Sequence, residues 1–311
     1  MNGQKIGLWI PPRESLASPI TADSPAVVVS PICQLIHENL RDLGIECYDN
    51  LDIRKAILKN NKVYVDGFCM SDLDHFIWMG YIDRAIDSYP AEVLRVLEFN
   101  VKVYNSNSFY SVATDKFTAF SLLHQHGIPV SEIYLVNQDN AESLRPLFEE
   151  SSFLLKPRRA GFGLGIIKVD RFSQFLDILD YHPKRSYYLE KFYPNDIEDW
   201  IGVTVMNGRA LYGFRKKSEK VSGWKVFDRS KVGGKVNYVE LSPEIEDMAL
   251  RIGEILGGSF YGLDFIKTDE GYKVVDINCF PGIYHDFITE LDLPIADIFL
   301  GMLEVPQKAL V

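Results

Sequence analysis

The sequence contains no hydrophobic run long enough to cross a bilayer, which takes about 20 consecutive apolar residues. Its N-terminus has an apolar stretch of only five residues, IGLWI, before Pro11 and Pro12. That stretch is too short for the apolar core of a signal peptide. We therefore predict that it is the first strand of the fold and that the protein has no membrane partner.

Cysteine and histidine are scarce and scattered. The four cysteines form no CxxC pair, and the six histidines show no ligand spacing. This pattern favours buried thiols in a reducing cytoplasm over disulfides or a zinc site. A cytoplasmic location is the expectation.

Positive charge is also in short supply, because 33 lysines and arginines face 43 aspartates and glutamates, for a net charge of −10. Such an excess argues against a nucleic-acid partner. Residues 215–235 are the exception, since eight basic residues there face two acidic ones, which gives +6 by difference. A solvated loop is the usual meaning of such a run. In an acidic chain we favour a patch that attracts anionic ligands.

The composition is otherwise that of a globular protein, with 47% hydrophobic and 24% charged residues among 311. This supports two or three packed lobes. In the first hundred residues, short apolar runs alternate with helical spacing, as in an open α/β sheet. The strands expected there lie at 5–10, 45–48, 62–65, 75–78 and 101–105, and the helices at 31–43 and 90–99.

A second unit is expected to begin near Asn107, with a helix that Thr114 caps and Gly127 ends. From about Tyr187 the pattern is mainly strand-like, apart from helices at 243–256 and 295–303. Between these points we expect strands at 132–136, 153–156, 166–169 and 186–191, and helices at 142–150 and 172–179.

The most informative segment is 262–282, GLDFIKTDEGYKVVDINCFPG. Apolar and polar residues alternate on both arms, which predicts two strands joined by a tight turn. A three-residue loop with Gly271 in the left-handed conformation would pair Thr268 with Tyr272. Counting outward, Asp264 then lies opposite Asp276.

Asn278 lies two residues beyond Asp276 and therefore shares its face with Asp264 and Asp276. Like charges on opposite residues destabilise a sheet, so a positive group must compensate. Oxygen ligands suit a hard cation, and Mg²⁺ commonly shares its shell with substrate phosphates. The alternative is a solvated acidic face; we favour the metal site.

The segment 156–166, KPRRAGFGLGI, joins two expected strands. Gly161, Gly163 and Gly165 let the backbone approach an anion and turn N–H groups toward it. Lys156 could reach the same anion as a point charge. The loop is not a Walker A motif, because no GK[ST] follows. A plain flexible hairpin is the alternative.

Lys116 lies in the first turn of the Thr114-capped helix, where a cation opposes the helix dipole. A bound phosphate would explain this position, but a solvated lysine paired with Asp115 or Glu142 is the alternative. The strand ending before Pro194 could offer backbone groups to an adenine edge, and Asp199 could accept hydrogen bonds from a ribose. An edge strand with a turn is the alternative reading.

Together these features resemble the ATP-grasp superfamily with the glutathione-synthetase-like fold, and most closely its RimK-like carboxylate–amine ligases. The similarity runs from about Asp83 to the C-terminus. Its anchors are TDKFTAFSLLHQHGIPV (114–130), LLKPRRAGFGLGIIKV (154–169), YLEKFYPNDIED (188–199), GLDFI (262–266) and VVDINCFPG (274–282). The last anchor also resembles inositol polyphosphate kinases, which share the fold.

The resemblance implies an α/β (α+β) protein with the ATP-grasp fold. Residues 1–106 would form an N-terminal open α/β pre-ATP-grasp domain, and residues 107–186 the small lid subdomain. Residues 187–311 would form the C-terminal antiparallel-sheet subdomain with the metal site. Proteins of this fold are often homodimers or homotetramers, which is the expectation for assembly.

The resemblance also implies ATP as cofactor with two Mg²⁺ ions, for which Mn²⁺ can substitute. Lys116 and Lys156 would bind the ATP phosphates, and Lys156 and Arg215 would act at the transferred phosphoryl group. The remaining implied roles are the phosphate loop for Gly161, Gly163 and Gly165, the adenine hinge for Glu190, Lys191, Phe192 and Tyr193, the ribose contact for Asp199, and metal ligation for Asp264, Asp276 and Asn278. Two departures are Asp276, where the family commonly has Glu, and Ile201, where it has arginine.

The implied reaction joins a carboxylate to an amine at the expense of ATP, through an acylphosphate, with release of ADP and phosphate. The expected partners are a small-molecule or peptide carboxylate and an amine co-substrate such as an amino acid. Little side-chain acid–base chemistry is needed, in keeping with the lack of a Ser-His-Asp or Cys-His arrangement. The alternatives are an inositol-polyphosphate-type kinase and a non-catalytic nucleotide-binding module.

Overall fold

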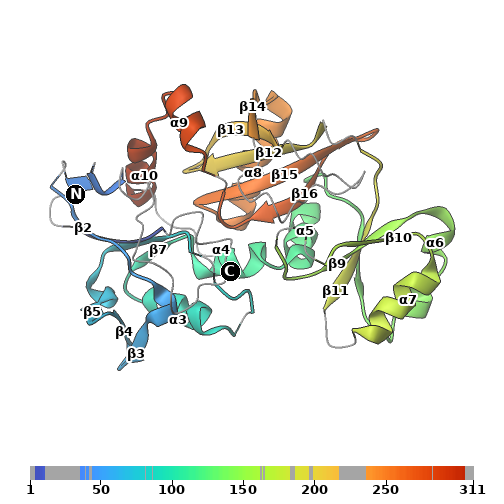
Figure 1. Cartoon of the computed structure of the whole chain (residues 1–311), viewed down its shortest axis with the longest axis horizontal. Helices are drawn as coiled ribbons and strands as arrows, with labels where there is room; N and C mark the ends of the chain where they lie inside the picture. Colours follow the sequence, from blue (N-terminus) through green and yellow to red (C-terminus); the bar gives the residue numbers. More distant parts are fainter. Residues whose placement is uncertain are drawn as a thin grey trace.

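The computed structural model describes residues 4–10, 36–38, 40–41, 44–80, 82–85, 87–161, 163, 165–182, 186–195, 199–216, 236–281 and 283–304. The molecule is elongated (Figure 1). Its N-terminal and C-terminal elements lie together over one part of the length, and β8–β11 with α6 and α7 form a lobe at the other end.

The N-terminal sheet is parallel, with the order β2-β1-β6-β7. All four residues of β6 are buried, as expected for a parallel sheet covered on both faces. Helix α3 connects β6 to β7 and buries Val93, Leu94 and Leu97. The predicted open α/β arrangement is confirmed. The bounds are β1 Lys5–Trp9, β2 Glu46–Tyr48, β6 His75–Trp78, α3 Tyr89–Leu97 and β7 Lys102–Tyr104.

One expected member of this sheet belongs elsewhere. The strand at 62–65 exists as β4 (Lys62–Val65), but it pairs antiparallel with β3 (Ile57–Lys59) and β5 (Phe68–Cys69). Tight turns with positive φ at Asn60-Asn61 and Asp66-Gly67 connect these strands, as two-residue hairpins require. The helix expected at 31–43 lies largely outside the described residues; 36–38, 40 and 41 are helical.

The middle sheet is antiparallel, with the order β10-β9-β11-β8. It has its own apolar core, which includes Phe153, Leu155, Phe175 and Leu189. The single helix expected at 142–150 is wrong, because Pro146 divides it into the 3-10 turn η3 and the short helix α6. The bounds are β8 Ile133–Val136, η3 Ala141–Leu144, α6 Leu147–Glu150, β9 Phe153–Pro157, β10 Ile167–Val169, α7 Phe172–Tyr181 and β11 Tyr187–Lys191.

The C-terminal sheet is antiparallel, with the order β14-β13-β12-β15-β16, as predicted for this part of the chain. Its residues Met206 and Phe260 share a buried cluster with Ile6, Leu8 and Ile77 of the N-terminal sheet. The bounds are β12 Ile201–Met206, β13 Arg209–Lys216, β14 Val236–Val239, α8 Pro243–Leu256, β15 Phe260–Thr268, β16 Gly271–Asn278, α9 His285–Glu290 and α10 Ile295–Glu304.

The β15–β16 hairpin reaches its predicted central pairing by a different route. At the turn, Thr268 pairs with Gly271, not with Tyr272, so the predicted turn register is wrong by one residue. A bulge that leaves Val275 unpaired then shifts the register by one residue between Phe265 and Asp264. Asp264 therefore lies opposite Asp276, as predicted.

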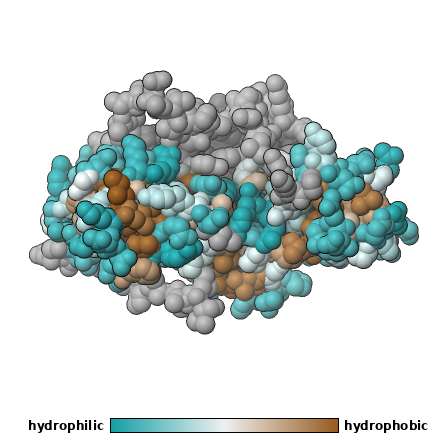
Figure 2. Space-filling model, turned by 90° about the horizontal axis from the view of Figure 1, so that it is seen from below, coloured by the Kyte–Doolittle hydropathy of each residue, from teal (hydrophilic) through white to brown (hydrophobic). Residues whose placement is uncertain are grey.

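The face seen from below is mainly hydrophilic and carries separate apolar patches (Figure 2). Large hydrophobic side chains that are well exposed include Ile57, Phe99 and Tyr181. Within the described ranges, no helix is long and apolar enough to cross a membrane. Of the three described cysteines, all free thiols, Cys279 is buried as expected, whereas Cys47 and Cys69 are half-buried; Cys33 lies outside the described residues.

Candidate functional site

The first helix of the site begins one residue later than predicted. The N-cap of α5 (Lys116–Gln125) is Asp115, whose carboxylate accepts a hydrogen bond from the Thr118 N–H. Thr114 instead ends the preceding helix α4 (Asn107–Ala113) and donates from its hydroxyl to the Tyr110 carbonyl. Because Asp115 is the cap, Lys116 is the first residue of α5.

Lys116 is buried and forms an ion pair with Asp276 of β16, 160 residues away. The pairing with Asp115 or Glu142 that was the alternative is not present in the described chain: Asp115 pairs with arginines and Glu142 with Arg145. Lys116 therefore supplies the positive charge that the acidic hairpin requires.

The charge balance around Asp276 keeps its carboxylate ionised. Burial alone would raise the pKa of Asp276, but the nearby Lys116, Lys156 and Arg84 lower this pKa below its ordinary value. Its side chain is 25% exposed, so the residue is not sealed from solvent. An ionised carboxylate is the form that a hard cation binds.

The three predicted metal residues fit a cation site that a bound ligand would complete, and not one that protein side chains complete by themselves. Asp264 and Asp276 are cross-strand partners, and Asn278 pairs with Gly262 at the end of the same hairpin. In the described part of the chain, no group of three or more His, Cys, Asp or Glu side chains could hold a metal by itself. Two carboxylates and an amide suit Mg²⁺ when phosphate oxygens complete its shell.

A second ion pair lies inside the middle sheet. Lys156, near the end of β9, places its Nζ 2.7 Å from Glu190 Oε1 on the neighbouring strand β11. The two side chains are only 6% and 2% exposed. The Tyr188 hydroxyl donates to the other Glu190 oxygen at 3.2 Å, and burial raises the pKa of Tyr188 well above its ordinary value. The charged lysine is thus fixed where the glycine loop begins.

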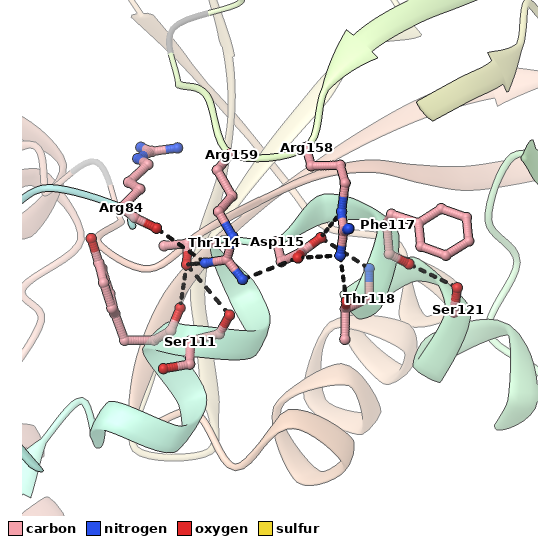
Figure 3. Close-up of polar contacts among 10 residues, drawn as sticks. Arg84, Ser111, Thr114, Asp115, Phe117, Thr118, Ser121, Arg158 and Arg159 are labelled. Carbon is pink, nitrogen blue, oxygen red and sulfur yellow. Dashed lines mark hydrogen bonds and ion pairs between the residues drawn. The ribbon is translucent and has the colours of Figure 1, made fainter. Parts of the chain in front are cut away.

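The loop after Lys156 is tied to the start of α5 by charge (Figure 3). Arg158 binds the Asp115 carboxylate through two nitrogens, at 3.1 and 2.6 Å, and Arg159 binds it at 3.0 Å. The Lys116 N–H also donates to the Arg158 carbonyl at 3.0 Å. Sequence reasoning did not assign Asp115, Arg158 or Arg159, although the RR pair directly after KP was the available signal.

The three loop glycines differ in what they provide. Gly163 and Gly165 have φ values of 63° and 74°, a conformation that favours glycine. Gly161 is not in that region, but a Cβ there would lie 2.6 Å from Arg84 Nη2. A side chain from the N-terminal part of the protein therefore lies directly over the glycine loop.

The predicted hinge segment continues β11, which is an internal strand of the middle sheet. The edge-strand alternative is therefore wrong. The N–H groups of Lys191 and Phe192 already donate to the carbonyls of Glu132 and Ser152. The Tyr193 ring lies under the Lys191 and Lys273 ammonium groups, at 5.7 and 4.8 Å.

Two predicted residues lie apart from the ion pairs. Asp199 is half-buried and directly precedes Trp200 and β12. Arg215 lies on β13 opposite Asn237, and its buried Nε has no hydrogen-bond partner among the described residues. Most of the basic segment 215–235 lies outside the described residues, so only Arg215 and the backbone of Lys216 are placed.

The geometry thus joins two buried lysines, a glycine loop and an acidic hairpin, and comparison with known families agrees with it. The family model of the RimK-like ATP-grasp domain matches residues 113–298, which contain all of these elements. The chain belongs to this family. The predicted fold class and the predicted enzyme class, an ATP-grasp ligase that forms carbon–nitrogen bonds, are confirmed at this level.

Relatives with curated names are ligases. A probable α-L-glutamate ligase from Xanthomonas campestris is 25% identical, over 65% of this chain and 70% of that protein. The tetrahydromethanopterin:α-L-glutamate ligase from Methanocaldococcus jannaschii is 26% identical, over 75% and 77%. The α-aminoadipate–LysW ligase LysX from Saccharolobus solfataricus is 26% identical, over 65% and 74%.

Solved structures share the fold over nearly the whole chain. The ATP-grasp ligase PsnB, in complex with a minimal precursor, Mg and ADP, has a TM-score of 0.63 at 17% identity and covers 97% of this chain and 98% of its own. D-alanine–D-alanine ligase from Bacillus anthracis has a TM-score of 0.63 at 13% identity, with 97% of each chain covered. The shared fold therefore includes the N-terminal sheet, which lies before the family match.

Proposed function

We propose that the protein is an ATP-dependent carboxylate–amine ligase that works through an acylphosphate. One observation carries the proposal: buried lysines from two different elements, α5 and β9, both contribute positive charge at the same acidic residue, Asp276. A fold that buries two cations beside an acidic hairpin is arranged to hold a polyanion and its counter-ion together.

The nucleotide is proposed to bind between the glycine loop and the hairpin. Lys116 and Lys156 would neutralise phosphate oxygens, and the loop N–H groups around Gly163 and Gly165 would donate to them. Asp264, Asp276 and Asn278 would hold Mg²⁺, which neutralises charge on the phosphates when bound. The proposed domains are the segments 1–106, 107–186 and 187–311, except that β11 at the start of the third pairs with β8 and β9 and so belongs with the second; the nucleotide would lie between the second and third.

In the proposed reaction, a carboxylate oxygen attacks the γ-phosphorus of ATP, the bond to the bridging oxygen breaks, and ADP leaves. The amine nitrogen then attacks the acyl carbon and phosphate leaves with the bonding electron pair. The nitrogen loses its proton to phosphate or water. The chain's own groups orient the reactants and offset charge; Lys156, held by Glu190, and Arg215, whose Nε has no described partner, are the proposed contacts to the transferred group.

The named relatives direct the choice of substrates. Two are glutamate ligases, and LysX joins α-aminoadipate to LysW. We therefore propose an α-amino acid, with an acidic one tested first, as one co-substrate and a small-molecule or peptide carboxylate as the other. The basic residues of 215–235 would favour such acidic co-substrates.

The test is a matrix of amino acids against small acids and peptides in the presence of Mg·ATP, with ADP and phosphate release as the readout. We expect release only when a carboxylate and an amine are both present, and a product whose mass equals their sum less water. A matched Asp276→Asn variant should release neither. Stimulation by a hydroxyl compound alone, with a phosphorylated product, would contradict the ligase and support a kinase.

A further inference from the structure

Arg84 belongs to the N-terminal part of the protein but reaches the glycine loop. It follows β6 and precedes α3, outside the range 113–298 that the family model matches. Its Nη1 donates to the Ala160 carbonyl at 2.7 Å, across 76 residues of sequence. The rest of the guanidinium covers Gly161, whose missing side chain leaves the space that Arg84 occupies.

The backbone that carries Arg84 is held in place. Its carbonyl accepts a hydrogen bond from Arg159 Nη1 at 3.0 Å, and Arg159 is itself bound to Asp115. The neighbouring carbonyl of Asp83 accepts from the Ser88 hydroxyl at 3.0 Å. Figure 3 shows the Arg84 carbonyl turned toward Arg159 while the guanidinium points away from the Asp115 cluster.

Arg84 differs from the two lysines of the site in its partners. Lys116 and Lys156 are each paired with a carboxylate, Asp276 and Glu190. Within the described ranges, the Arg84 guanidinium forms no ion pair, and the one hydrogen bond that it donates goes to a neutral carbonyl. A guanidinium has further N–H donors in a planar fork that matches phosphate oxygens.

The position of this charge is set by both walls of the site. One contact is to the glycine loop, at Ala160 and Gly161. On the other side, the Arg84 carbonyl accepts from Arg159, which binds Asp115 at the start of the helix that carries Lys116, the partner of Asp276. Arg84 therefore lies at the glycine loop and beside the start of α5, where the proposed function puts the end of the triphosphate.

We propose that Arg84 binds the terminal phosphoryl group of the nucleotide and so gives the site its preference for ATP over ADP. The inference rests on the proposed function, and it adds a residue from the N-terminal part to the machinery. Because the Arg84 guanidinium is bonded to the Ala160 carbonyl, the start of the glycine loop would be held beside the γ-phosphoryl group.

Calorimetry with Mg·ADP and with a Mg-bound non-hydrolysable ATP analogue tests this without any co-substrate. For Arg84→Met we expect affinity for the analogue to fall about tenfold, the loss of one charge-assisted contact, with ADP affinity unchanged. Arg84→Lys should lose part of this preference. Arg95→Met, which removes an exposed arginine of α3 paired with Glu92, is the matched control and should leave both affinities unchanged.

The substitution Gly161→Ala tests the contact between Arg84 and the glycine loop from the side of the loop. Its new Cβ must displace the Arg84 guanidinium, so it should lower the analogue-to-ADP preference less than Arg84→Met. In the double variant Arg84→Met/Gly161→Ala, the glycine substitution should cause no further loss of the analogue-to-ADP preference, because the contact is already lost. Added guanidinium ion should restore part of the preference in Arg84→Ala and none in Gly161→Ala.

The outcomes separate the two proposals. If the wild-type protein binds neither nucleotide, the proposed function fails. If it binds both and Arg84→Met keeps the wild-type preference, or weakens ADP equally, the inference about Arg84 is overturned. An unchanged nucleotide preference with a raised KM for the acid co-substrate would also overturn it, since Arg84 would then bind the acceptor carboxylate.

Discussion

The middle sheet and the C-terminal sheet both hold charged side chains, but they balance them differently. In the middle sheet, Lys156 and Glu190 come from adjacent strands, so the sheet supplies both signs. In the C-terminal sheet, two aspartates, Asp264 and Asp276, oppose each other across a hairpin. Their cation comes from α5, 160 residues earlier.

The Lys156–Glu190 pair is therefore a local pair, formed within one sheet, whereas the Lys116–Asp276 pair is an assembled pair, formed between distant segments. The Lys156–Glu190 pair depends on strand register within one sheet that has its own apolar core. The acidic hairpin is balanced only after α5 brings Lys116 to Asp276, with Lys156 and Arg84 near enough to act on its charge. A site whose charges come from several segments is complete only when those segments are together, which suits a site that must assemble around a ligand.

The largest expected effect is from breaking the local pair. Lys156→Met leaves Glu190 buried with no cation, and we expect a loss of about 3–5 kcal/mol in the free energy of unfolding. The double variant Lys156→Met/Glu190→Leu should recover most of this loss, because a well-packed apolar pair replaces a buried ion pair at little cost. Urea unfolding measures both. A double variant as unstable as the single one would show that the pair does not act as a unit.

Breaking the assembled pair should cost less. Lys116→Met leaves Asp276 near Lys156 and Arg84 and 25% exposed, so we expect a loss of about 1–3 kcal/mol. Mg·ADP should stabilise the variant less than the wild type, because the stabilisation by a ligand increases with the logarithm of its affinity. Thermal melting with and without Mg·ADP checks this. An equal ligand-induced rise in Tm would contradict a role for Lys116 at the nucleotide.

A carboxylate without a lysine sharpens the comparison. Burial raises the pKa of Glu98 to about 7, although the Asn107 N–H donates to it and Arg95 is near. Because the folded-state pKa of Glu98 exceeds the ordinary value of 4.5, the protonated, neutral Glu98 favours the folded state over the unfolded one. This contribution to the free energy of unfolding is fully present below pH 4.5 and is lost as the pH rises through 7.

Glu98→Gln should remove that pH dependence while keeping an acceptor for the Asn107 N–H. At pH 8 we expect the variant to be more stable than the wild type by about 1–2 kcal/mol, and at pH 4.5 to be equal to it. Unfolding free energies across this range decide the matter. Parallel pH profiles for the two proteins would rule out Glu98 as the source.

The smallest effect is expected at an exposed pair. Glu142 and Arg145 are 66% and 56% exposed, so Glu142→Gln should change stability by no more than about 0.5 kcal/mol. Measured beside the buried variants, it provides the baseline for a solvent-screened ion pair. A loss of unfolding free energy as large as that of Lys116→Met would contradict the proposal that the loss increases with the burial of the ion pair.

Sequence patterns predicted most helices and strands, because hydrophobic periodicity and glycine or proline boundaries are local properties. Errors arose where two signals competed. Thr114 and Asp115 can both cap a helix, and only the fold shows that Asp115 does so. The hairpin reached the correct Asp264–Asp276 pairing through two shifts of one residue that cancel, the turn and the bulge at Val275.

Residue types and their short spacings were enough to predict the chemical groups of the site: an acidic hairpin, a glycine loop after Lys156, and Lys116 at the start of a helix. These depend on residue type and short spacing. Which charges meet depends on the packing of distant segments: Lys116 meets Asp276, Arg158 and Arg159 meet Asp115, and Arg84 meets the glycine loop. Such partners are separated by 43 to 160 residues, and Coulomb forces act through space, so their pairing is a property of packing and not of the local sequence.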